Sequence, residues 1–74
     1  MPTLTNISGR EAVKAFVRSG FIHARTSGDH AILTKPNQHT LSIPFHKEVK
    51  PFLLKAQLRR ANISEKEFLE LLKG

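Results

Sequence analysis

Residues 21–43, with the sequence FIHARTSGDHAILTKPNQHTLSI, contain three short extended segments that are separated by two turns. The expected strands are 21–25, 30–34 and 40–43, and the expected turns are 27–29 and 35–38. In the turns, Gly28 tolerates a positive φ and Pro36 fixes φ at a corner position. In the last strand, Leu41 and Ile43 alternate with polar residues and therefore share one face. Connections this short favour an antiparallel meander.

A helix is expected before this stretch, over residues 8–19. Ser8 and Glu11 have the spacing of a capping box, in which each side chain accepts a hydrogen bond from the other residue's backbone N–H. Gly20 is expected to end the helix as a left-handed residue. The apolar face consists of Ala12, Val13, Phe16 and Val17, and the opposite, basic face consists of Arg10, Lys14 and Arg18.

Two more helices are expected after the stretch. Pro51 suits the first turn of a helix over 50–61, because its missing N–H costs nothing there, and Asn62 is expected to end that helix. Ser64 and Glu67 form a second capping-box pair, which opens a short helix. The apolar residues of the two helices are Leu54, Leu58 and Ala61 in the first, and Phe68, Leu69, Leu71 and Leu72 in the second.

The expected order of elements is therefore helix, three strands, helix and short helix, which predicts an α+β fold. A sheet with one apolar face needs a cover, and the two main helices supply it in a two-layer α-β-β-β-α sandwich. The double-stranded-RNA-binding fold has this element order, here followed by a short extra C-terminal helix, but the order alone does not settle function. With 74 residues the chain is expected to be one domain, 1–74, in which 1–6 form a mobile lead-in.

The composition favours an anionic partner. The chain has 12 Lys and Arg against 6 Asp and Glu, a net charge of +6, which attracts nucleic acid, an anionic membrane surface or an acidic protein. No apolar run is long enough to cross a membrane. The absence of cysteine excludes disulfides and thiolate metal sites, and it fits the reducing cytoplasm. The expected phosphate-binding residues are Arg10, Lys14, Arg18, His46, Lys47, Lys50, Lys55 and Arg59.

Four histidines are candidates for chemistry, at positions 23, 30, 39 and 46. No pair has the spacing of helical zinc ligands, so no metal site is expected. His30 follows Gly28 and Asp29, where a tight turn meets a strand, and an imidazole held there can reach a surface groove. In RNA cleavage it would take the 2′-hydroxyl proton or protonate the leaving oxygen. The alternative is a strand histidine with no function.

The other histidines and Asp29 have open roles at this point. Asp29 either orients the imidazole of His30 or serves only the turn. His46 either caps the second main helix or lines the same groove as His30. His23 and His39 are expected on strands, with surface or structural roles.

Several short motifs occur together in a familiar order. They are Gly20-Phe21 after the first helix, Gly28-Asp29-His30 before a strand, Ile43-Pro44-Phe45-His46 before a basic loop and a Leu-rich helix, and then Ala61-Asn62-Ile63-Ser64 and Glu67-Phe68. In order and spacing they resemble the HicA family of toxins, small RNA-cleaving partners in HicA–HicB toxin–antitoxin pairs. The resemblance covers residues 8–72, nearly the whole chain.

The resemblance implies a double-stranded-RNA-binding-like fold used by a ribonuclease that needs no metal or other cofactor. Its catalytic histidine lies in a Gly-Ser-His-like turn and corresponds to His30. Asp29 stands where the family commonly has a small residue such as Ser. The resemblance also implies that a cognate antitoxin blocks activity by covering the site.

Three functions therefore compete. The first is an mRNA-cleaving toxin, whose antitoxin should be acidic because the chain is basic, and should cover His30 and the loop 47–50. The second is a non-catalytic module that holds structured RNA by shape and has no need of a turn histidine. The third is a DNA-binding regulator, which needs a recognition helix. The helix 50–61 offers Lys55, Gln57, Arg59 and Arg60 for that role, but the rest of the pattern is absent.

The aromatic residues bear on how RNA would be held. All five are Phe, and most fall on core faces or beside them, with Phe45 as the exception. Because stacking platforms for single-stranded bases need exposed aromatic rings, binding is expected to come mainly from phosphate contacts.

Overall fold

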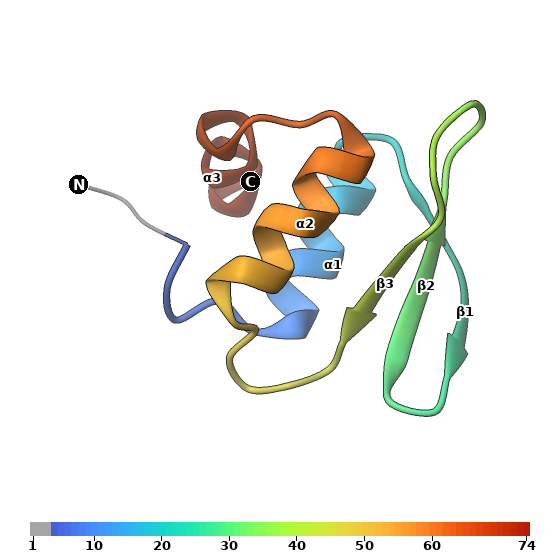
Figure 1. Ribbon diagram of the computed structural model, residues 1–74, viewed down its shortest axis with the longest axis horizontal. Coiled ribbons are helices and arrows are strands. Elements are labelled where there is room, and N and C mark those ends of the chain that lie inside the picture. Colours follow the sequence, from blue (N-terminus) through green and yellow to red (C-terminus); the bar gives the residue numbers. More distant parts are fainter. Residues whose placement is uncertain (1–3) are drawn as a thin grey trace.

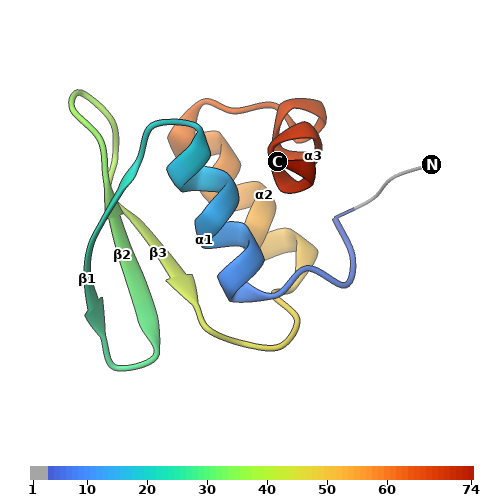
Figure 2. The same ribbon diagram turned by 180° about the vertical axis from the view of Figure 1, so that it is seen from behind.

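The architecture was established from a computed structural model, in which residues 4–74 are described (Figure 1). The elements are α1 (Gly9–Arg18), β1 (Ile22–Ser27), β2 (His30–Thr34), β3 (Leu41–Pro44), α2 (Pro51–Ala61) and α3 (Glu65–Lys73). This order confirms the expected α+β fold with its short extra C-terminal helix. The views in Figures 1 and 2 show the three helices on one side of the sheet, which gives the two layers.

The sheet is an antiparallel meander in the order β1-β2-β3, as the short turns predict. Ala31 lies opposite Ile43 and Leu33 lies opposite Leu41, and all four side chains are buried. The expected bounds of β2 are confirmed, whereas β1 and β3 are shifted toward the C-terminus relative to 21–25 and 40–43. Every residue of β1 is exposed, so burial leaves no alternating pattern from which its ends could be located.

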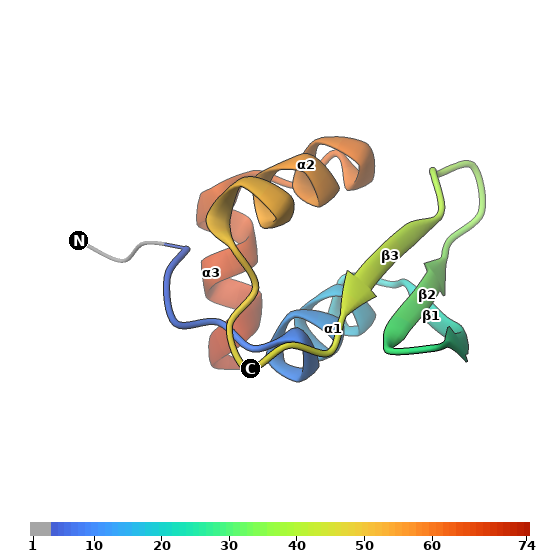
Figure 3. The same ribbon diagram turned by 60° about the horizontal axis from the view of Figure 1, so that its bottom comes forward.

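Phenylalanine rings connect α1 to the rest of the core. Phe16 packs against Phe21 with ring centroids 5.9 Å apart, and against Phe68 of α3 with centroids 5.1 Å apart. Phe68 is fully buried, and α3 lies against α1 (Figure 3). The short C-terminal helix therefore completes the core.

Among residues 4–74, Val17, Ile22 and Phe52 are the large apolar side chains that are exposed, and the sequence placed Val17 and Phe52 on or beside core faces. Val17 is 44% exposed and Phe52 is 66% exposed. The helix α1 packs on the sheet with one side and on α3 with another, so its buried arc includes Ala15 and excludes Val17.

The ends of α1 follow the sequence signals. Ser8 Oγ accepts a hydrogen bond from the Glu11 N–H at 3.1 Å, and Glu11 Oε1 accepts one from the Ser8 N–H at 3.0 Å. The predicted capping box is therefore confirmed, and its hydrogen bond from the Ser8 backbone to the Glu11 carboxylate lowers the pKa of Glu11. Gly20, with φ of 112°, ends the helix in the positive-φ region as expected.

The second helix begins and ends as predicted, and the third begins as predicted with one difference. Pro51 occupies the first turn of α2, and Asn62 ends it in the left-handed region with φ of 59°. At the start of α3, Ser64 Oγ accepts a hydrogen bond from the Glu67 N–H at 3.0 Å. Within residues 4–74 the return bond from the Glu67 carboxylate is not formed, so only half of the second capping box is present.

The segment before α1 is partly packed. Leu4 and Ile7 are buried in the core, and the Asn6 N–H donates a hydrogen bond to Glu48 Oε2 at 3.1 Å. Of the segment 1–6 that was expected to be a mobile lead-in, residues 1–3 lie outside the described part of the chain. Within the described part, Leu4 is already packed into the core.

Candidate active site

Three segments that are distant in sequence meet at one end of the sheet, near the start of β2. The Phe45 N–H donates a hydrogen bond to the Asp29 carbonyl at 2.8 Å, which ties the β1–β2 turn to the chain after β3. The Gly9 N–H donates to the His46 carbonyl at 2.9 Å, which ties the start of α1 to the same chain. The turn itself contains Gly28 at φ of 61°, as its sequence predicts. Figure 1 shows the turn, the end of β3 and the start of α1 at the lower end of the molecule.

The side chain of Asp29 lies between two histidines at this end of the sheet. Its Oδ1 is 2.9 Å from His30 Nδ1, and its Oδ2 is 3.8 Å from His46 Nε2. The side chains of His30, His46 and Asp29 are 45%, 56% and 66% exposed, so a solvent-borne substrate can reach them. Within residues 4–74 the second ring nitrogen of His30, Nε2, makes no hydrogen bond or ion pair.

This arrangement decides two open points. Of the two roles considered for Asp29, contact with the imidazole is present, in addition to its place in the turn. For His46, the structure shows a position beside Asp29, the residue that also contacts His30, whereas α2 has Lys50 as its N-cap residue and no side-chain cap bond. A partly exposed imidazole whose Nδ1 contacts a carboxylate and whose Nε2 has no partner among residues 4–74 is suited to proton transfer.

Some of the predicted phosphate-binding residues surround this end of the sheet. The Arg10 guanidinium lies over the Phe45 ring, 5.6 Å from its centroid. Lys14 lines the same groove as Arg10 and Phe45. Lys47 and Lys50 are exposed in the chain between β3 and α2, directly after His46.

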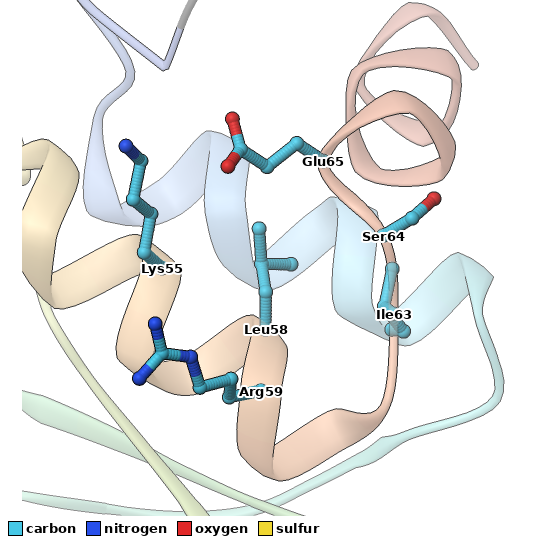
Figure 4. A pocket seen from close by; sticks show the side chains of 6 residues that line it. All are labelled: Lys55, Leu58, Arg59, Ile63, Ser64 and Glu65. Carbon is cyan, nitrogen blue, oxygen red and sulfur yellow. The ribbon is translucent and has the colours of Figure 1, made fainter.

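Three other predicted phosphate-binding residues lie away from this end of the sheet. Arg18 donates from Nη1 to the Leu71 carbonyl at 2.7 Å, which places it against the C-terminal turns of α3. Lys55 and Arg59 line a shallow pocket between α2 and the start of α3, together with Leu58, Ile63, Ser64 and Glu65 (Figure 4). Among residues 4–74, none of these three contacts the Asp29–His30 turn.

The remaining histidines, His23 and His39, differ in whether they lie on a strand. His23 lies on β1 as expected, but its ring is 6.3 Å from that of Phe45, so it belongs to the groove beside Arg10. His39 lies between β2 and β3 rather than on a strand. No sequence signal pointed to the grouping of His23 with Phe45, because 22 positions separate them and His23 belongs to no motif.

The described residues contain neither a cluster of metal-binding side chains nor a membrane-spanning helix. Over residues 4–74, no three His, Cys, Asp or Glu side chains are placed to hold a metal ion together. No helix in the same range has the length and apolar character needed to cross a bilayer.

Comparison with known proteins assigns the family. A family model described as the HicA toxin of bacterial toxin–antitoxin matches residues 9–63, which include the Asp29–His30 turn, the chain after β3 and α2. Comparison with curated proteins finds no match. Membership of a toxin–antitoxin family supports a toxin role and implies a cognate antitoxin as the partner. Because the match spans well over half of its 74 residues, the chain belongs to the HicA toxin family.

Proposed function

We propose that this toxin is an endoribonuclease that cleaves mRNA in the cytoplasm, with His30 as the general acid/base and without a metal. The observation that carries the proposal is the contact of 2.9 Å between Asp29 and His30 Nδ1, in an exposed turn beside basic side chains. The carboxylate engages Nδ1, and within residues 4–74 Nε2 has no hydrogen-bond partner, so Nε2 is available to a substrate. Arg10, Lys14, Lys47 and Lys50 supply positive charge around it.

The reaction would use the RNA's own 2′-hydroxyl as the nucleophile. The 2′ oxygen forms a bond to the adjacent phosphorus as the bond from phosphorus to the 5′ oxygen breaks, leaving a 2′,3′-cyclic phosphate and a 5′-hydroxyl. His30 Nε2 takes the 2′-hydroxyl proton, and a water molecule gives a proton to the departing 5′ oxygen on the opposite side of the phosphorus. His30 then releases its extra proton to solvent. The nearby cations and the imidazole of His46 stabilise the charge that builds up on the phosphate oxygens.

The alternative is a basic module that binds RNA without cutting it, with which the element order of the fold is also consistent. A cleavage assay in EDTA decides between the two. We expect the purified chain to cut single-stranded RNA under these conditions and to leave the same strand intact when one 2′-deoxynucleotide replaces the ribonucleotide at the cut position. Binding without cleavage would support the module. Cleavage of the deoxy-substituted strand, or cleavage lost in EDTA and restored by Mg²⁺, would contradict the mechanism.

The antitoxin provides a second test. An active ribonuclease harms its own cell, and a chain of charge +6 attracts an acidic partner, which would exclude RNA by steric overlap and by charge. We expect RNA cleavage to fall to zero at one equivalent of the cognate antitoxin, and His30 to become protected from diethyl pyrocarbonate. Exposed His39 is the matched control and should stay reactive. Full cleavage at saturating antitoxin, or a bound complex in which His30 is still modified, would refute occlusion of the site.

A further inference from the structure

The groove between α1, β1 and the chain after β3 has the composition of a nucleotide-binding subsite. It is lined by Arg10, Val13, Lys14, His23 and Phe45, with no acidic side chain among them, and its volume is about 250 Å³. Two of these residues carry permanent positive charge and two carry aromatic rings. Basic side chains interleaved with aromatic rings are the composition that binds single-stranded nucleic acid, because the cations contact phosphates and the rings stack on bases.

The rings of the groove are held in place before any ligand binds. Phe45 is half-buried and packs against the core, so its ring is a rigid wall. The ring of His23 is inclined to it at 54°, with centroids 6.3 Å apart, and His23 Nε2 is 3.1 Å from Thr26 Oγ1. Arg10 lies over Phe45 at 5.6 Å, and a guanidinium in that position can itself stack on a base.

The groove is connected to the proposed active site through the backbone. Phe45 is the residue whose N–H is bonded to the Asp29 carbonyl, and His46 follows it directly. An RNA strand whose scissile phosphate lies at His30 can therefore reach Phe45 with a neighbouring nucleotide. Sequence reasoning expected binding mainly through phosphates, but the tertiary structure adds His23 and Arg10 to the one Phe that sequence left outside the core.

We infer that this groove holds one unpaired base of the RNA substrate between the Phe45 ring and the Arg10 guanidinium, which moves away from the ring to admit the base, with Lys14 on a flanking phosphate. The inference rests on the proposed ribonuclease function and adds a subsite that recognises an unpaired base. A base inside a duplex is already stacked and paired, so the substrate is single-stranded at this nucleotide. Stacking on a phenyl ring tolerates all four bases, so the site selects for unpaired RNA more strongly than for sequence.

The test uses the full chain with His30→Ala, which leaves the RNA uncut, and a 5′-fluorescein single-stranded RNA octamer. Fluorescence anisotropy gives the dissociation constant. We expect Phe45→Leu, which keeps an apolar side chain of similar packing, to weaken binding by about 5- to 150-fold, the factor for losing one stacked base. Phe52→Leu is the matched control, because Phe52 is 66% exposed and lies on α2 outside the groove, and it should bind as tightly as the parent.

A second measurement needs no change in the groove. Removing the bases of the octamer one at a time should reproduce the loss of affinity at one position, and 2-aminopurine placed there should be quenched on binding. A perfect duplex of the same sequence should bind more weakly than the single strand. Equal affinity for every abasic octamer, or equal affinity of Phe45→Leu and the parent, would overturn the subsite.

The two proposals fail separately in these experiments. If His30-containing protein cuts RNA while every abasic octamer binds alike, the ribonuclease function stands and the subsite is wrong. If one abasic position loses affinity while the unsubstituted protein never cuts RNA, the subsite stands and the ribonuclease proposal is wrong.

Discussion

Replacing His30 with alanine should slow RNA cleavage by about 10²–10⁴-fold, the usual contribution of a positioned general acid or base. The structure gives the physical reason. Asp29 Oδ1 is 2.9 Å from His30 Nδ1, and Nε2 is left to transfer protons at the scissile phosphate. Initial rates measured in EDTA with one RNA substrate check this expectation. Affinity for the RNA should change little, because the cations that hold the phosphates are intact.

His39→Ala is the matched control for this result. It removes the same side chain from an exposed position at the opposite end of β2, between β2 and β3, and should leave the cleavage rate unchanged. Asp29→Ala should give an intermediate loss of rate, because the ring remains but loses the carboxylate that orients it. Wild-type rates in the His30→Ala protein would remove His30 from the mechanism. Equal losses in the His30 and His39 variants would point to a general effect on the fold.

Gly9→Ala should destabilise the fold more than a surface substitution of similar size. A Cβ placed on Gly9 would overlap the Pro44 carbonyl oxygen and would lie 2.8 Å from Phe45 Cα. These are backbone atoms, and the Gly9 N–H is bonded to the His46 carbonyl at 2.9 Å, so neither side can withdraw without losing that bond. Overpacking costs about 1–3 kcal/mol, and a buried donor left without its partner costs about 1–3 kcal/mol more. The total free energy of unfolding of a domain of this size is only about 4–11 kcal/mol.

The free energy of unfolding is measured from urea titrations followed by circular dichroism at 222 nm. Gly28→Ala is the control, because a Cβ there meets nothing within 4 Å and only the backbone conformation, with φ of 61°, is unfavourable. Gly28→Ala should lower the free energy of unfolding by about 1–2 kcal/mol. A Gly9→Ala protein as stable as the parent would show that the start of α1 is not pressed against the end of β3.

Local signals in the sequence predicted most of the fold. The Ser8–Glu11 capping box, Gly20, Pro51 and Asn62 act within one or two turns of the chain, so the side chains that make them effective are neighbours in sequence. The errors occurred where burial depends on distant elements. Val17 and Phe52 are apolar at helical spacing, but the packing of α3 on α1 and of α2 on the sheet leaves both exposed.

The candidate site also has features that the sequence predicted and features that only the tertiary structure revealed. The place of His30 after the Gly28–Asp29 turn follows from the sequence, and so does the resemblance to the HicA family that the comparison confirms. The approach of His46 to Asp29, and of His23 to Phe45, depends on the pairing of β2 with β3 and with β1. Nothing local specifies these contacts.

The sequence by itself determined the α+β class, the helix ends, the tight turn that presents His30 and the basic charge, because each depends on residues a few positions apart or on composition. Only the tertiary structure decided which cations and rings surround that histidine. It brought Asp29 between two histidines, formed the groove of Arg10, His23 and Phe45, and required glycine at position 9. The physical reason is that these contacts join the start of α1, the β1–β2 turn and the end of β3. Only the packing of the two layers brings those three segments within reach of one another.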